Sequence, residues 1–229
     1  MSGWRSGSAP PSTGSGGLEP ASAVPNRGLG IPTVVAAGFV VCALLFAWVT
    51  TEMHRPPRRA LPSPVRPAVV LVPIGEVPRG RVQDLPRDYG AEYGLSMTLV
   101  DGVGLPREAF DPARRQYVAQ DLISAVVAAR PDDVAAGRVV IGVTAADIYV
   151  RGVAWDWAYA QRQSGQFAVV SLARMPNGRY DNQARLFRKM LTRQIGFLCY
   201  GLPPSDNPYD VLDRDILGLD DLRRIFDHL

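Results

Sequence analysis

The sequence predicts a layered α/β (α+β) domain, in which a mixed sheet packs with two main helices, preceded by one transmembrane helix. Short apolar runs rich in β-branched residues alternate with longer segments of helical periodicity. A stretch of twenty residues near the start contains no charged residue. The predicted organisation is a disordered tail rich in Gly, Ser and Pro at 1–30, a transmembrane helix at 31–51, a Pro- and Arg-rich spacer at 52–67, and a globular domain at 68–229.

The uncharged stretch 31–50 has the length of a membrane-spanning helix. At 1.5 Å per residue, about 20 helical residues span about 30 Å, the thickness of the hydrocarbon layer. Trp48 lies near one end, where interfacial aromatic residues are common. A buried soluble helix is the first alternative, and apolar residues on every side of the helix argue against it. A cleaved signal peptide is the second, and the length of the run and of the tail before it argues against that.

The charges around this stretch indicate on which side of the membrane the domain would lie. Only Arg5 and Arg27 precede the span, whereas four arginines follow it: Arg55, Arg58, Arg59 and Arg66. The positive-inside rule therefore favours a single-pass protein with its domain in the cytoplasm. A signal anchor with the domain outside is the competing interpretation, because large folded domains cross membranes largely regardless of charge.

The first half of the domain begins with a buried strand at 68–75, which is short, apolar and stopped by glycine. A helix over 81–93 follows and is closed by the sequence EYG, after which 95–102 forms a second strand. The segment 111–130 has the clearest helical signal. Asp111 suits its N-cap, the following proline suits its first turn, and the proline at 131 ends it.

The second half of the domain adds two strands and two helices. The run 138–150 is apolar and β-branched, which predicts a central strand, and 167–175 predicts another. Residues 182–200 form a long amphipathic helix. A short helix capped by Asp220 ends the chain.

Composition excludes several classes of function. The net charge is +3, and the basic residues are spread along the chain without an aromatic-interleaved stripe, so no nucleic-acid binding is expected. The glycines of DGVGLP lack the third glycine of a dinucleotide site, and there is no phosphate-binding loop or nucleophile elbow. We therefore expect no nucleotide and no other cofactor.

The two cysteines and two histidines of the chain exclude further sites. Cys42 lies in the predicted span and Cys199 in the late helix, so they do not form a disulfide or a thiolate zinc site. A catalytic Cys199 would need a base, but His54 lies in the spacer and His228 is the penultimate residue. Cys199 is therefore expected to be a core thiol.

An acidic cluster follows the late helix, but its spacing does not match a calcium-binding loop, which needs a glycine at position 6 and a glutamate at position 12. Helix caps and solvated turns are the better interpretation of these aspartates: Asp206, Asp210, Asp213, Asp215, Asp220 and Asp221.

The stretch LTRQIGFLCYGLP, residues 191–203, has the rhythm of a zinc-protease helix without its chemistry. A zinc helix needs two histidines four residues apart on one face. Arg193 and Phe197 have this spacing, but a guanidinium is a permanent cation and a phenyl ring has no lone pair. Gln194 follows Arg193 where such helices carry a glutamate, and an amide is not a base near neutral pH.

Five segments together resemble an archaemetzincin, a minimal zinc-dependent peptidase of the metzincin type. They are VLVPIG, LPREAFDPARRQYVAQDLI, VVIGVTAADIYV, AVVSLAR and LTRQIGFLCYGLP, they follow the family's order, and they cover about residues 69–205. The resemblance implies a metzincin-like mixed sheet. It maps the three histidines of H-E-x-x-H-x-x-G-x-x-H onto Arg193, Phe197 and Pro203, and the glutamate onto Gln194. The family's four-cysteine zinc site and its methionine turn have no counterpart here. We therefore predict no metal and no zinc peptidase activity.

The resemblance also implies an edge strand that aligns peptides beside the cleft, here residues 166–175 with Val169 and Ser171. On this hypothesis the chain is a membrane-anchored inactive pseudopeptidase that binds a peptide or protein partner or serves as a scaffold. The alternative is an active metal-dependent hydrolase with non-standard ligands. Arg193 would pair with a peptide carboxylate or with an internal aspartate such as Asp206. Internal pairing, with Phe197 filling the former metal cavity, is favoured.

Overall fold

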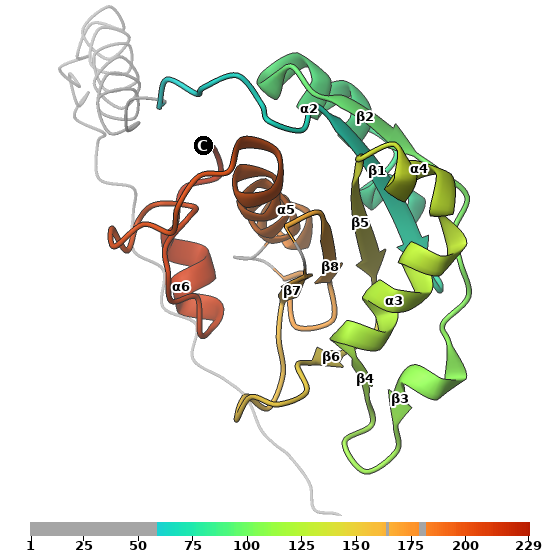
Figure 1. The fold of residues 1–229 in the computed structure, drawn as a ribbon. Coiled ribbons are helices and arrows are strands. Elements are labelled where there is room, and N and C mark those ends of the chain that lie inside the picture. Colours follow the sequence, from blue (N-terminus) through green and yellow to red (C-terminus); the bar gives the residue numbers. More distant parts are fainter. Residues whose placement is uncertain (1–58, 164, 179–181) are drawn as a thin grey trace, which may run out of the picture. The chain divides into compact units, whose positions relative to one another are not determined.

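A computed structural model describes residues 59–163, 165–178 and 182–229, and these residues belong to one compact unit. Its centre is a five-stranded sheet with the strand order β2-β1-β5-β8-β7 (Figure 1). The four strands from β2 to β8 are parallel, and β7 is antiparallel to β8. The strands are β1 Ala68–Ile74, β2 Ser96–Leu99, β5 Val139–Thr144, β7 Ala160–Gln163 and β8 Phe167–Ser171.

Helices cover both faces of this sheet and create two separate cores. On one face, α3 (Ala119–Ala129) packs its apolar side against residues such as Val70, Val140 and Val169. On the other face, α2 (Leu85–Tyr93), α5 (Gln183–Tyr200) and α6 (Leu219–Arg224) enclose a larger core. The central strands are buried on both sides, which explains why their sequences are continuous apolar runs instead of alternating ones.

The remaining elements are short. Two 3-10 turns, η1 (Arg79–Arg81) and η2 (Arg107–Ala109), and the helix α4 (Pro131–Ala135) connect the larger elements. A second sheet with the order β3-β4-β6 consists of β3 Phe110–Asp111, β4 Gln116–Val118 and β6 Ile148–Tyr149.

The predicted mixed sheet with two main helices is confirmed, and α3 and α5 are those helices. The first strand, the second strand and the late helix lie where the sequence predicts them. The helix predicted at 81–93 begins later, at Leu85, and ends where Gly94 adopts a left-handed conformation.

The helix predicted at 111–130 is wrong in its first third. Asp111 is the last residue of β3, and its Oδ1 accepts backbone N–H bonds from Ala113 (2.9 Å) and Arg114 (3.3 Å). These bonds close a turn, and Arg115 completes the reversal at φ +57°. The chain then forms β4, and the helix begins only at Ala119. Aspartate followed by proline suits a turn as well as a helix start, so local sequence does not separate the two.

Two further predictions need correction. The strand predicted at 138–150 is two strands in different sheets, β5 and β6, separated by a turn in which the hydroxyl of Thr144 accepts the N–H of Ala146 at 3.1 Å. The last helix is not capped by Asp220, which lies within its first turn. The N-cap residue is Gly218. Asp221, in the first turn, closes the helix start, because its Oδ2 accepts the N–H groups of Leu217 and Gly218, both at 3.0 Å.

The predicted tail and transmembrane helix, and the spacer up to residue 58, lie outside the described residues. Within residues 59–229 as described, no helix is both long and apolar enough to cross a bilayer. The membrane anchor therefore stays a prediction from the sequence of residues 31–51.

Candidate functional site

Helix α5 carries the residues that the resemblance maps onto the zinc motif, and local chemistry defines both its ends. Asn182 precedes the helix, and its Oδ1 accepts N–H bonds from Ala184 (3.0 Å) and Arg185 (3.3 Å). Gly201 ends the helix at φ +64°, a conformation that glycine adopts without strain.

Gly196, in the middle of α5, lets the C-terminal segments pack directly on the helix. A Cβ atom at this position would lie 2.7 Å from a methyl group of Leu212 and 2.7 Å from one of Leu229. Such contacts are too short for any side chain, so only glycine permits this approach. The close packing brings the loop around Leu212 against Arg193.

Arg193 bonds internally, but to main-chain oxygens instead of a carboxylate. Its Nη1 donates to the carbonyl of Val211 (3.3 Å) and to that of Asp213, and its Nη2 donates to the carbonyl of Arg214 (3.3 Å). Burial and, to a smaller extent, the nearby Arg162 lower the pKa of Arg193 to about 10. The predicted partner Asp206 instead pairs with Arg214 at 3.0 Å.

Phe197 is partly buried and lies close to two guanidinium groups. The Cζ atom of Arg162, on β7, is 3.9 Å from the ring centroid, and that of Arg193 is 5.0 Å away. Pro203 is exposed. The three mapped ligand positions thus present a guanidinium, a phenyl ring and a pyrrolidine ring, and none of these offers a lone pair to a metal.

Zinc does not fit these residues. Arg193 already donates to carbonyl oxygens, which is the opposite of what a metal ligand does. Across the described residues, no three His, Cys, Asp or Glu side chains lie close enough together to hold a metal ion. We derive no chemical step through zinc.

Gln194 and Tyr159 place two buried polar groups beneath the lining of a cleft. Their exposed fractions are 5% and 4%. Gln194 Oε1 and the hydroxyl of Tyr159 have no hydrogen-bond partner among the described residues. Burial raises the pKa of Tyr159 to about 12, so the hydroxyl keeps its proton at neutral pH. Each unsatisfied buried group costs about 1–3 kcal/mol, which indicates that both groups are suited to a partner that the chain itself does not supply.

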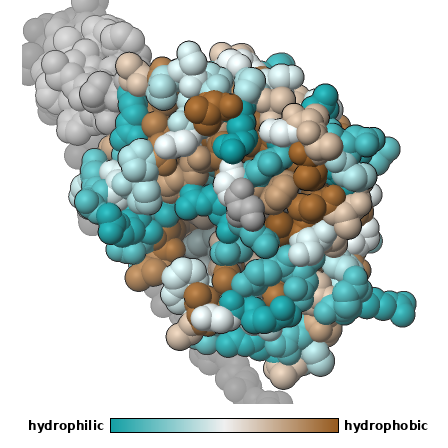
Figure 2. All heavy atoms as spheres, viewed as in Figure 1, coloured by the Kyte–Doolittle hydropathy of each residue, from teal (hydrophilic) through white to brown (hydrophobic). Residues whose placement is uncertain are grey.

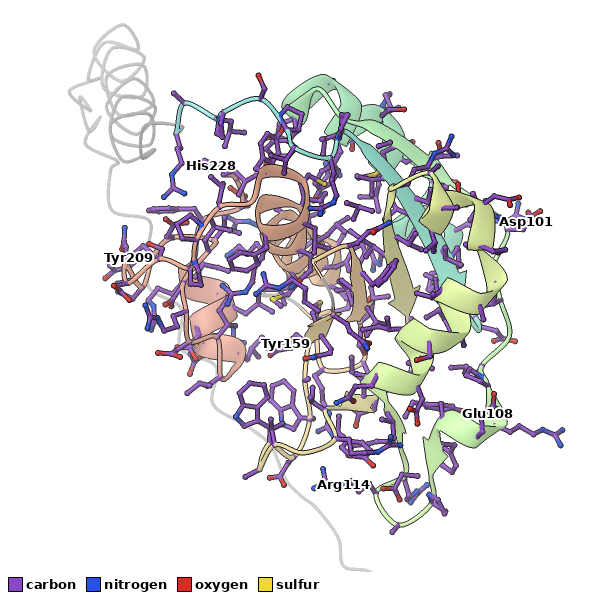
Figure 3. All side chains as sticks on the ribbon, viewed as in Figure 1. Asp101, Glu108, Arg114, Tyr159, Tyr209 and His228 are labelled. Atoms are coloured by element: carbon purple, nitrogen blue, oxygen red, sulfur yellow. The ribbon has the colours of Figure 1, made fainter. Side chains whose placement is uncertain are left out.

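The cleft beside these groups has a volume of about 530 Å³ and is open. Residues Ala154–Ala160 form one wall, Arg214–Leu217 the other, and the α5 side chains of Met190, Arg193 and Gln194 the base. Tyr159 is labelled in Figure 3 between α6 and the sheet. Each wall carries an exposed apolar side chain at this site, Trp155 with 52% and Leu217 with 66% of its surface exposed. Elsewhere, hydrophobic residues on the face drawn in Figure 2 are interrupted by hydrophilic ones.

The prediction that residues 166–175 form an edge strand is wrong. Strand β8 pairs with β5 on one side and β7 on the other, so Val169 and Ser171 are 0% and 1% exposed. The hydroxyl of Ser171 donates to the carbonyl of Ala146 at 2.6 Å. Strand order depends on which strands meet across the sheet, and the sequence of β8 does not contain that information.

Strand β7 is the edge strand, and one end of it lines the cleft. The N–H of Ser171 donates to the carbonyl of Tyr159 at 2.8 Å, which makes these two residues a hydrogen-bonded pair. Antiparallel pairs alternate between bonded and non-bonded. The non-bonded positions along this ladder are therefore the pairs Ala160 with Val170 and, two residues further on, Arg162 with Ala168. The N–H groups of Ala160 and Arg162 therefore point away from β8, towards the free edge.

The acidic segment after α5 consists of turns and helix caps, as predicted. Asp210 Oδ1 accepts the N–H of Leu212 at 2.9 Å, and Asp213 Oδ1 accepts that of Asp215 at 3.3 Å. The prediction of a core thiol is also confirmed, because Cys199 is fully buried and burial raises its pKa to about 12.

Comparisons with known proteins agree with this fold. No protein-family model matches the chain. An archaemetzincin of Haloquadratum walsbyi is 27% identical over 147 residues, which cover 61% of this chain and 82% of that protein. The crystal structure of the Archaeoglobus fulgidus archaemetzincin complexed with malonate matches with a TM-score of 0.58 at 18% identity, over 70% of this chain and 94% of that one. The Methanopyrus kandleri archaemetzincin matches with a TM-score of 0.57 at 22% identity, over 71% and 88%.

This chain is archaemetzincin-like. Sequence and fold both support the resemblance. The mapping of individual residues onto the zinc motif stays a prediction. In this archaemetzincin-like chain the aromatic wall of the cleft was missed by sequence reasoning. The available signal was the segment AWDWAYA, residues 154–160, in which two tryptophans flank an aspartate between predicted strands.

Proposed function

We propose that this protein is a membrane-anchored, catalytically inactive archaemetzincin-like pseudopeptidase that binds an extended peptide or protein segment in the cleft. The observation that carries the proposal is the open cleft itself, with the unpartnered polar groups of Gln194 and Tyr159 beneath its lining. A cleft filled by Phe197 and Arg193 would have favoured a purely structural role.

Two features argue against hydrolysis. The positions mapped onto the zinc ligands carry Arg193, Phe197 and Pro203, and they offer no ligand atom. Without a metal to lower its pKa, water stays protonated near neutral pH and is a poor nucleophile. Gln194 cannot remove its proton, because an amide is not basic near neutral pH.

Two features support binding of an extended segment. The outward N–H groups of Ala160 and Arg162 can pair with the backbone of an added strand. A peptide group also carries both a donor and an acceptor, which suits Gln194 Oε1 and the hydroxyl of Tyr159.

Anchoring rests on residues 31–51 alone. The arginines that follow the span favour a cytoplasmic position for the domain. Protease protection of a C-terminal tag in sealed membrane vesicles tests both statements, and a tag that partitions with the soluble fraction contradicts the anchor.

Binding is tested with the full-length protein in mild detergent on an array of immobilised 12-residue peptides. Ala160→Pro removes one outward N–H and closes the edge, whereas Ala160→Val has similar bulk and keeps the N–H. We expect the proline variant to lose the peptides that the wild type and the valine variant retain. Equal binding by both variants, with unchanged circular dichroism, contradicts strand addition.

Inactivity is tested by elemental analysis and by incubation with casein. One tightly bound metal ion per chain together with cleavage of casein would overturn the proposal. That result would establish the alternative, a metal-dependent hydrolase with non-standard ligands.

A further inference from the structure

Several groups in and beneath the lining of the cleft can accept a hydrogen bond or attract a cation, although Arg193 and Arg214 also line it. Gln194 Oε1 is a buried acceptor without a donor. Asp156 lies in one wall and Asp215 in the other. The indole of Trp155 is half exposed, and the face of such a ring attracts cations. These features come from three separate segments of the chain.

Asp215 stands out among the aspartates of its segment because it lacks an ion pair. Each of the others has a basic partner in the described residues. The pairs are Asp206 with Arg214 (3.0 Å), Asp210 with Arg59 (2.7 Å), Asp213 with Arg224 (3.7 Å), Asp220 with Arg223 (2.8 Å) and Asp221 with Arg224 (2.9 Å). The side chain of Asp215 makes no hydrogen bond or ion pair within the part of the chain that the structure describes.

Asp156 is similarly unpaired. Its main-chain oxygen accepts a bond from Arg114 at 3.5 Å, but its carboxylate has no partner among the described residues. It lies between Trp155 and Trp157, and the guanidinium of Arg174 is already 5.6 Å from the ring centroid of Trp157. This wall of the cleft therefore already accommodates one cation beside an indole.

The two arginines that line the cleft are engaged elsewhere. Arg214 pairs with Asp206, and Arg193 donates to three carbonyl oxygens of the segment 211–214. Their donors are turned to these partners. The carboxylates of Asp156 and Asp215 accept no hydrogen bond from the described residues, although Asp156 attracts Arg174 and Asp215 attracts Arg193 at longer range. The positive charge of Arg193 weakens the attraction of the cleft for a cationic ligand. Arg193 does not, however, donate a hydrogen bond to Gln194 Oε1.

We propose that the cleft recognises a cationic side chain, arginine or lysine, in the segment that binds there. The cation lies between Asp156 and Asp215 and contacts the face of Trp155, and it donates to Gln194 Oε1 once that side chain turns its buried amide oxygen towards the cleft. This inference rests on the proposed function, since it names the chemistry of the ligand for the same cleft.

The test uses full-length protein in mild detergent and fluorescein-labelled peptides of the form Gly-Ala-X-Ala-Gly. X is arginine, lysine, citrulline, leucine or glutamate. Citrulline has the shape of arginine without its charge. We expect the arginine and lysine peptides to bind about tenfold more tightly than the citrulline peptide, and the difference to shrink at high salt.

Variants of the protein locate the effect. Asp156→Asn and Asp215→Asn should each weaken binding of the arginine peptide about fivefold and leave the citrulline peptide unchanged. Asp101→Asn is the matched control. Asp101 is exposed, and Figure 3 shows it at the upper right edge of the view, away from Tyr159 near the centre. Gln194→Met, which keeps the length of the side chain but removes its acceptor, should also weaken binding of the arginine peptide.

The outcomes separate this inference from the proposed function. Equal binding of the arginine, citrulline and leucine peptides, lost on Trp155→Ala, overturns the preference for a cation and leaves the cleft as a peptide site. Tighter binding of the glutamate peptide overturns the preference as well and points to Arg193 instead. If none of these peptides binds and the peptide array is also empty, both proposals fail.

Discussion

Lys189 is the only lysine of the chain, and it is buried on α5 with 1% of its surface exposed. Its Nζ donates to the carbonyls of Leu222 (3.0 Å) and Arg223 (2.7 Å), in the last turn of α6. Burial, with a smaller contribution from Arg185 and against the opposing effect of Asp227, lowers the pKa of Lys189 from 10.5 to about 8. Replacement of Lys189 by methionine removes the titrating group at similar side-chain length.

The sign of the pH effect follows from this depressed pKa. Between about pH 8 and pH 10.5 the unfolded chain keeps the proton that the folded chain has lost, so the free energy of unfolding rises with pH. A shift of about 2.5 units at 1.36 kcal/mol per unit corresponds to about 3 kcal/mol. The cost of burying the charge is complete below pH 8 and has disappeared above pH 10.5.

The assay is urea unfolding of the full-length protein in mild detergent at several values of pH from 7 to 10.5. The free energy of unfolding of the wild type minus that of Lys189→Met should increase by up to about 3 kcal/mol across this range. Lys189→Arg is the control, because arginine stays charged throughout and its difference from methionine should not rise. A wild-type difference that is flat or falls with pH refutes the burial of a charged amine at this position.

Three further predictions concern α5. Gly196→Ala should lower the free energy of unfolding by about 1–3 kcal/mol, because the added methyl group meets Leu212 and Leu229, and a thermal melt measures this. Arg193→Met should cost about 2–4 kcal/mol, since it leaves carbonyls of the segment 211–214 without their donor; an unchanged melting temperature contradicts this. Cys199 should resist iodoacetamide at pH 8 and react after unfolding, as mapped by mass spectrometry, because it is buried and its pKa is raised to about 12.

Elements with strong local signals were predicted well. The run 68–74 is apolar throughout, which indicates a strand covered on both faces, and β1 is such a strand. Asn182 and Gly201 mark the ends of α5 through bonds that each residue makes within its own neighbourhood. Helical periodicity placed the start of α3 too early in the chain, because Asp111 closes a turn with the same bonds that it would make as a helix cap.

The candidate site was only half predictable. Arg193 and Gln194 were identified because they stand at recognisable positions on one helix. Tyr159 and Asp215 were not, because they lie in irregular segments before and after α5 that share no helical pattern with it. No local pattern predicts which loops pack beside a helix.

The sequence by itself determined the strands β1 and β2 and the helix α5, the likeness to archaemetzincins, and the lack of zinc-binding side chains at the mapped positions, since all of these depend on residue identity and local spacing. Only the tertiary structure decided that β7 and not β8 is the edge, that Arg193 binds carbonyl oxygens, and that an open cleft remains beside Gln194. These features depend on contacts between residues distant in the chain, and packing of the whole domain selects those contacts.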